Sequence, residues 1–155
     1  MAKIRTLRRC ALFRNLTFRD LACLAPHIQE ETVEPKTWLA EEGKPSEGLI
    51  ILRTGRVRLI PAQPAGAEVI LGPEDFFGEL SVIDSGNGVP RRAVGAQAME
   101  RCEFLRLNGK HYQQLVSESP DVAGKVALGV LEALHRKMEN VRGTMATLFA
   151  QGSVR

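Results

Sequence analysis

The sequence has no long hydrophobic run, so we expect no membrane-spanning helix. A span needs about 20 consecutive, mainly apolar residues, and no segment of this 155-residue chain approaches that length. The N-terminal residues 1–16 are basic, but Arg14 interrupts their apolar residues, so no signal peptide is predicted. We therefore expect a cytoplasmic protein that has no membrane partner.

The sequence is also poor in cysteine and lacks the common metal and catalytic motifs. Its cysteines, Cys10, Cys23 and Cys102, are odd in number and form no C-x-x-C pair. Reduced and mostly buried thiols in a cytoplasmic protein are the simplest interpretation. The histidines show no H-E-x-x-H or other paired metal spacing, and no G-x-S-x-G is present. The sequence therefore predicts no metal site and no enzyme.

The charge balance is only weakly basic, with 21 Lys and Arg against 18 Asp and Glu. Proteins that bind nucleic acid usually concentrate basic residues on one face, whereas here basic residues are interleaved with acidic ones. No direct nucleic-acid binding is expected. The densest basic stretch near the end of the chain, residues 135–137, is interpreted as a solvated helix face.

The first 29 residues are predicted to be helical. Thr17 begins a Thr-x-x-Asp pattern that is close to a capping box, and Leu21, Leu24 and Ile28 follow at helical spacing.

The middle of the chain, residues 30–107, consists of short apolar runs that are separated by glycine and proline. Such regular spacing predicts an antiparallel roll, barrel or sandwich. The predicted strands cover residues 37–40, 49–52, 57–60, 69–71, 93–98 and 102–107.

The last stretch, residues 108–150, changes to a helical period and has no proline after Pro120. Alternate spacings of four and three are typical of the seam of a two-helix coiled coil, which predicts a homodimer through residues 127–148. The alternative is a helix that docks on its own domain. Both arrangements can hold together, because Val126 and Val130 lie beside the seam. The seam residues are Ala127, Leu131, Leu134, Met138, Val141, Met145 and Leu148.

The segment that indicates a binding site is Asp-Phe-Phe-Gly-Glu-Leu-Ser, residues 75–81. Gly78 allows the backbone to approach a ligand closely. If Glu79, Leu80 and Ser81 begin a short helical turn, their free N–H groups favour an anion. The Glu79 carboxylate suits a sugar hydroxyl, and an arginine from the Pro-Arg-Arg-Ala run further on suits a phosphate. The set predicts a ribose-phosphate pocket, although a surface turn explains each part separately.

In this order, these residues resemble the phosphate-binding cassette of cyclic-nucleotide-binding domains. That family includes the bacterial catabolite activator and the regulatory subunits of cyclic-AMP-dependent kinase. The cassette covers residues 76–93. The resemblance begins at residues 12–17, continues through Gly43 and the turn at residues 54–57, and extends over residues 108–121 and the long helix.

The resemblance implies an α+β fold in which one domain spans residues 1–155. Residues 1–29 form a helical lead-in, residues 30–107 form an antiparallel, jelly-roll-like β-roll, and residues 108–150 form C-terminal helices.

The resemblance also assigns roles to the cassette residues. Glu79 is implied to bind the ribose 2′-hydroxyl, while Gly78 and Leu80 offer backbone contacts. Arg92 is implied to hold the phosphate, because counting back from the following strand places it at the family's position. Arg91 is the alternative, and whichever arginine is not used is expected to be exposed.

Further positions match residues of the family that surround the base. Leu59 and Leu71 match the base pocket, although ordinary core packing explains them equally well. Met138 is a candidate cap over the purine or a seam residue. In the kinase branch an alanine at the position of Ala93 accompanies cyclic AMP, and threonine accompanies cyclic GMP, so cyclic AMP is favoured.

The sequence therefore predicts a sensor domain that binds a cyclic nucleotide and signals through movement or dimerisation of its C-terminal helix. Twelve residues separate Glu79 from Arg92, a few more than in most cassettes. One alternative is a degenerate module that keeps the fold for dimerisation or docking. Another is the sensor part of a transcription regulator that lacks its helix-turn-helix, because residues 151–155 are too few to form one.

Overall fold

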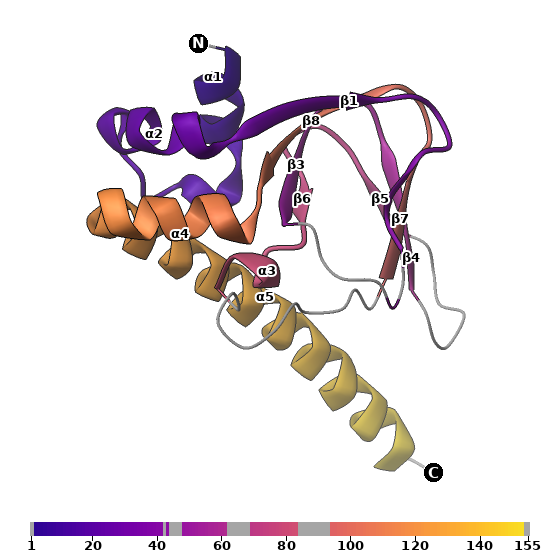
Figure 1. The fold of residues 1–155 in the computed structure, drawn as a ribbon. Helices are drawn as coiled ribbons and strands as arrows, with labels where there is room; N and C mark the ends of the chain where they lie inside the picture. The colour runs from indigo at the N-terminus through magenta and orange to yellow at the C-terminus, as the bar shows by residue number, and fades with distance from the viewer. Residues whose placement is uncertain (1, 42, 44–47, 62–68, 84–93, 154–155) are drawn as a thin grey trace.

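Two antiparallel sheets form a β-roll in the computed structural model, which describes residues 2–41, 43, 48–61, 69–83 and 94–153 (Figure 1). In this part of the chain one sheet has the strand order β1-β8-β3-β6 and the other has the order β2-β7-β4-β5. The α+β prediction is confirmed. The strands are β1 (Gln29–Val33), β2 (Trp38–Ala40), β3 (Leu49–Thr54), β4 (Val57–Pro61), β5 (Val69–Leu71), β6 (Phe76–Phe77), β7 (Val94–Ala98) and β8 (Cys102–Leu107).

Helices gather on one side of the roll, and the last helix runs beneath it (Figure 1). The N-terminal group comprises α1 (Ala2–Arg9), η1 (Ala11–Phe13), α2 (Phe18–Leu24) and η2 (Ala25–His27). The later helices are α3 (Leu80–Ile83), α4 (Gly109–Glu118) and α5 (Pro120–Ser153).

The predicted capping box at the start of α2 is present. The Thr17 hydroxyl accepts a hydrogen bond from the Asp20 amide at 3.2 Å, and Asp20 Oδ2 accepts one from the Thr17 amide at 2.9 Å. Lys125 Nζ of α5 also donates to Asp20 Oδ2 at 2.7 Å. The Lys125 ammonium and then the Thr17 amide lower the pKa of Asp20, because both stabilise the carboxylate. The cap therefore also ties α2 to α5.

Strand β3 separates two hydrophobic cores. Leu49 and Ile51 point into a cluster with the helices, while Ile50 and Leu52 point into a cluster between the two sheets. All four side chains are fully buried. Successive strand residues face opposite sides, so a continuous apolar run is what a strand covered on both faces requires.

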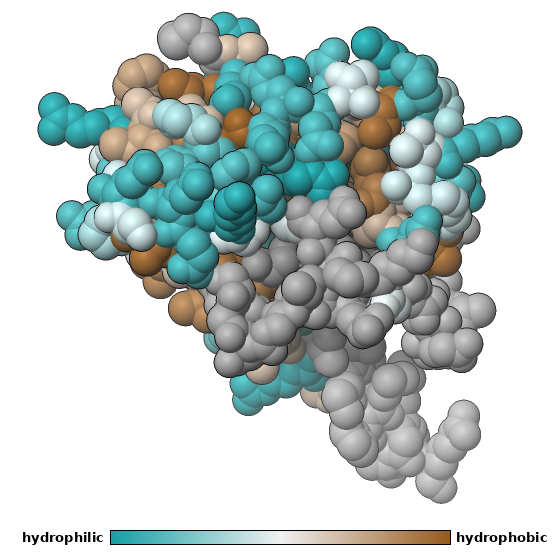
Figure 2. All heavy atoms as spheres, viewed as in Figure 1, coloured by the Kyte–Doolittle hydropathy of each residue, from teal (hydrophilic) through white to brown (hydrophobic). Residues whose placement is uncertain are grey.

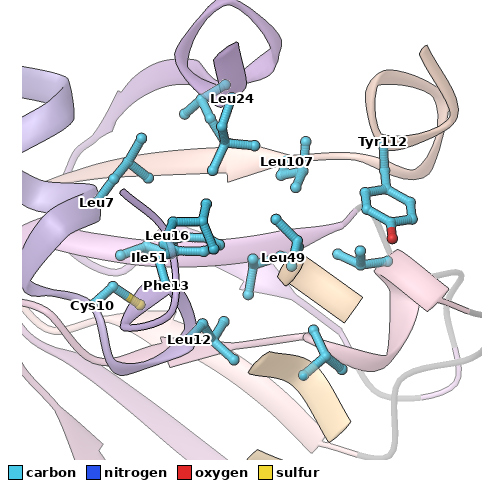
Figure 3. Close-up of a cluster of buried hydrophobic side chains, with 14 of the residues drawn as sticks. Leu7, Cys10, Leu12, Phe13, Leu16, Leu24, Leu49, Ile51, Leu107 and Tyr112 are labelled. Atoms are coloured by element: carbon cyan, nitrogen blue, oxygen red, sulfur yellow. The ribbon is translucent and has the colours of Figure 1, made fainter. Parts of the chain in front are cut away.

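The helical core includes Leu7, Leu12 and Phe13 as well as the Cys10 thiol (Figure 3). Burial raises the pKa of Cys10 to about 12, so the thiol is neutral and packs as an apolar group. Cys102 is also buried and Cys23 is exposed, and all three cysteines are free. The prediction that the cysteines are mostly buried is confirmed.

The first half of α5 is anchored on its own domain. The Tyr112 hydroxyl of α4 donates to the Ala123 carbonyl at 2.8 Å, and Val126 and Val130 are fully buried. At Gly129 the helix backbone meets η1 so closely that an added Cβ would lie 1.9 Å from the Leu12 carbonyl oxygen. The alternative of a helix docked on its own domain is thus confirmed for this part of α5, and the helix then continues past the roll (Figure 1).

The described residues of the predicted dimer seam differ in how far they are buried. Leu134 is partly buried against the core of its own domain, which corrects its assignment to a face that is free for a partner. Leu131 and Met138 are 54% and 69% exposed. The side chains of the later seam residues, 141, 145 and 148, lie outside the described residues.

The described part of the face in Figure 2 is mainly polar. On the face in Figure 2, hydrophilic residues cover most of the area and hydrophobic ones appear in smaller groups. Among the described helices, none has the length and hydropathy needed to cross a bilayer.

Candidate functional site

The predicted glycine-acid turn lies between the two cores. Strand β6 pairs with β3, with Phe77 opposite Ile50, and places Phe77 in the core between the sheets. Gly78 follows at φ +81°, a left-handed conformation that favours glycine. The chain then enters α3, where Val82 is fully buried in the helical core. Both ends of the turn are therefore anchored, and Glu79 is held between them.

Glu79 is a buried acid, with 3% of the residue exposed. Lys137 Nζ of α5 donates to Glu79 Oε1 and forms an ion pair with it. The Val82 amide donates to the Glu79 carbonyl at 3.3 Å and closes the first turn of α3. A carboxylate is costly to bury without a partner, so the lysine stabilises the charge that the turn removes from water.

The cassette residues that the structure describes follow one another along this turn. Gly78, Glu79, Leu80 and Ser81 are consecutive, and the predicted short helical turn is present as α3. Leu80 is 51% exposed.

Three predicted residues of the cassette, Arg91, Arg92 and Ala93, lie outside the described residues. Their assignments stay predictions.

The predicted base-pocket leucines lie on neighbouring strands of the second sheet. Leu59 of β4 and Leu71 of β5 are partly buried against the core that also contains Phe77, the residue before Gly78. Val69 stands directly opposite Leu59, so the two side chains project to the same face. Val69 is 51% exposed and extends this apolar face beyond the core. Sequence analysis did not single out Val69, because a short apolar run does not show which side of a strand is covered.

Lys137 is a second described residue that sequence reasoning missed at this site. The sequence assigns it to a solvated helix face, and its side chain is indeed 59% exposed, but its ammonium also pairs with Glu79, which the sequence did not predict. Lys137 lies 4, 7 and 11 positions after Ala133, Val130 and Val126, so it shares their helix face. All three of those residues are buried. The spacing was a usable signal that this cation points toward the domain.

A metal centre finds no support among the residues described. In that part of the chain no group of three or more His, Cys, Asp or Glu side chains is placed to hold a metal ion. The polar groups at the turn are instead the backbone amides of α3, the Glu79 carboxylate and the Lys137 ammonium.

These features define a β-roll domain that carries a buried acid in a tight turn and a long C-terminal helix. The model of the cyclic nucleotide-binding domain family matches residues 30–119. The chain belongs to the cyclic nucleotide-binding domain family.

Individual relatives show the same similarity. A CRP-like cAMP-activated global transcriptional regulator of Mycobacterium tuberculosis is 25% identical over 145 residues, which cover 92% of this chain and 61% of the regulator. The chain thus spans about three fifths of the length of that relative.

Solved structures agree with the fold. The catabolite activator protein of Thermus thermophilus superposes with a TM-score of 0.74 at 25% identity, covering 89% of this chain and 62% of that one. The regulatory domain of Toxoplasma gondii PKA, solved with cAMP, has a TM-score of 0.61 at 28% identity, covering 73% of this chain and 42% of that one.

Proposed function

We propose that this domain binds a cyclic nucleotide, with cyclic AMP preferred, and that Glu79 accepts a hydrogen bond from the ribose 2′-hydroxyl. The observation that carries the proposal is the buried Glu79 carboxylate, which directly follows the left-handed Gly78 and opens α3. The amides at the start of α3 and the guanidinium of Arg92 bind the phosphate in this proposal, with Arg91 as the alternative.

The second sheet supplies the base pocket in the same proposal. Leu59 and Leu71 form its floor, and the exposed Val69 extends it. For Met138, a cap over the base is the alternative to the role in helix pairing that is proposed below. Ala93 is the small residue beside the phosphate-binding arginine. The preference for cyclic AMP is supported by this alanine and by relatives that are named as cAMP-activated regulators.

Calorimetric titration with cyclic AMP and cyclic GMP tests the proposal. Cyclic AMP should bind with the higher affinity. If neither nucleotide produces heat of binding at about 1 mM, where even an interaction near 4 kcal/mol is measurable, the domain is a non-binding module.

Glu79→Gln should remove the recognition of the sugar. In the parent protein, 2′-deoxy cyclic AMP should bind about tenfold more weakly than cyclic AMP, because a hydrogen bond to a charged acceptor is lost. In the Gln variant the two nucleotides should bind with similar affinities. Glu74→Gln is the control, since Glu74 is an exposed acid that pairs with Arg9. A tenfold deoxy penalty that persists in Glu79→Gln would remove Glu79 from the sugar site.

We further propose that α5 is the output element and pairs with the same helix of a second copy. Leu131 and Met138 of α5 are more than half exposed. A sensor transmits its ligand state only through contacts that differ between two states, and α5 is the element that joins the cassette to this exposed face through Lys137. Ligand binding is proposed to shift the helix or its pairing.

Sedimentation velocity tests the pairing with the variant Leu131→Lys/Met138→Lys. Like charges would then oppose each other across the seam, so the parent should sediment as a dimer and the variant as a folded monomer. Leu134 is unsuitable for this test because it packs on its own core. Gln114→Lys/Ser117→Lys adds the same charge at exposed positions of α4 and should remain a dimer. A parent that stays monomeric with and without nucleotide would contradict the pairing.

A further inference from the structure

The ion pair between Lys137 and Glu79 joins the cassette to the C-terminal helix. Its two members differ strongly in exposure: the Glu79 side chain is 5% exposed and the Lys137 side chain is 59% exposed. The helix face that carries Lys137 is already fixed on the domain by the buried Val126, Val130 and Ala133. The first half of α5 is therefore held on the domain by apolar packing and does not need the ion pair between Lys137 and Glu79.

The same carboxylate is the proposed acceptor for the sugar hydroxyl. Glu79 is held between two cores by Phe77 and Val82, so it has little freedom to turn toward a new partner. Lys137, in contrast, has a long stem and a half-exposed head that regains water when it leaves. In an exchange of partners at this carboxylate, the lysine is the group that moves.

We propose that Lys137 and the ribose 2′-hydroxyl compete for Glu79, which makes Lys137 a specificity-determining residue of the nucleotide site. The inference rests on the proposed function. A ribonucleotide must displace the ammonium to gain its hydroxyl bond, whereas a 2′-deoxyribonucleotide leaves the ion pair in place. Lys137 therefore sets how strongly the site prefers ribose over deoxyribose. The displacement also loosens a tie between α5 and the cassette, which gives the ligand different contacts in two helix positions.

The test compares cyclic AMP and 2′-deoxy cyclic AMP by calorimetry on the parent and on Lys137→Met, which keeps an apolar stem and removes the charge. Cyclic AMP should bind about three- to tenfold more tightly to the variant, because the competing ion pair of a partly exposed lysine is absent. The affinity for the deoxy analogue should stay unchanged. The ribose preference should therefore rise by the same factor.

Two control variants isolate the effect. Arg136→Met removes the neighbouring cation, which lines a separate hollow with Arg14 and Asn15, and should leave both affinities unchanged. In a Glu79→Gln background, Lys137→Met should no longer tighten cyclic AMP binding. Thermal unfolding of each variant should remain cooperative.

Each remaining outcome is decisive. Unchanged or weaker cyclic AMP binding in Lys137→Met overturns the competition while the proposed function stands. Equal tightening of both nucleotides also overturns it, because the hydroxyl would then not be the competing group. A parent that binds neither nucleotide overturns the proposed function, and this inference with it.

Discussion

Gly129→Ala is expected to lower the free energy of unfolding by about 2–3 kcal/mol, which is the cost of an overpacked core position. The new methyl group would lie 1.9 Å from the Leu12 carbonyl oxygen and 3.0 Å from its carbon. Both are backbone atoms, so no side-chain rotation relieves the clash, and α5 or η1 must shift. Urea unfolding followed by circular dichroism measures the loss.

Gly124→Ala is the matched control on the same helix. Gly124 is exposed, and an added Cβ would meet nothing within 4 Å. Replacing glycine by alanine within a helix gains about 0.5–1 kcal/mol, so this variant should be more stable than the parent. Equal stability of the two variants would show that α5 and η1 do not approach as closely as described.

Arg92→Ala is expected to weaken cyclic AMP binding by about 3 kcal/mol, or roughly a hundredfold. A guanidinium offers two parallel donors to the exocyclic oxygens of a phosphate, and alanine removes both charge-assisted bonds. Calorimetric titration of the variant measures the loss. Thermal unfolding in the absence of nucleotide should show little change, because the lost contacts are to the ligand.

The neighbouring Arg91→Ala separates the two candidate arginines. It changes the same charge one residue earlier and should cost far less affinity. If the two substitutions weaken binding equally, or if Arg91→Ala weakens it more, the assignment of the phosphate-binding arginine in this proposal is wrong.

Most of the roll was predictable because its strands are apolar and are bounded by glycine or proline. Strand β1, in contrast, escaped prediction. Its sequence, Gln-Glu-Glu-Thr-Val, has one apolar residue, and it is held by pairing with β8 and by ion pairs. Arg106 Nε lies 2.5 Å from Glu31 Oε2, and Arg53 reaches Glu30 at 3.5 Å. Hydrophobic periodicity carries no information about a strand that is stabilised in this way.

The candidate site was predictable as a local motif and not as a set of long-range contacts. Gly78 and Glu79 are adjacent to the short helix that they open, so sequence spacing was enough to place them together. The partner of Glu79 lies 58 residues away. The helical pattern indicates only on which face of α5 Lys137 lies. Which residue it meets there depends on the packing of α3 on α5, which the sequence does not show.

Strand β3 also limits how this scaffold can be adapted. Its four successive residues, Leu49 to Leu52, serve the helical core and the inter-sheet core in alternation. A change of side-chain volume at any of these four positions disturbs a packed interior, so none of them tolerates a label or a reshaped pocket. Engineering toward another ligand would have to use exposed positions such as Val69 and Met138. The four residues of β3 that separate the two cores would have to stay unchanged.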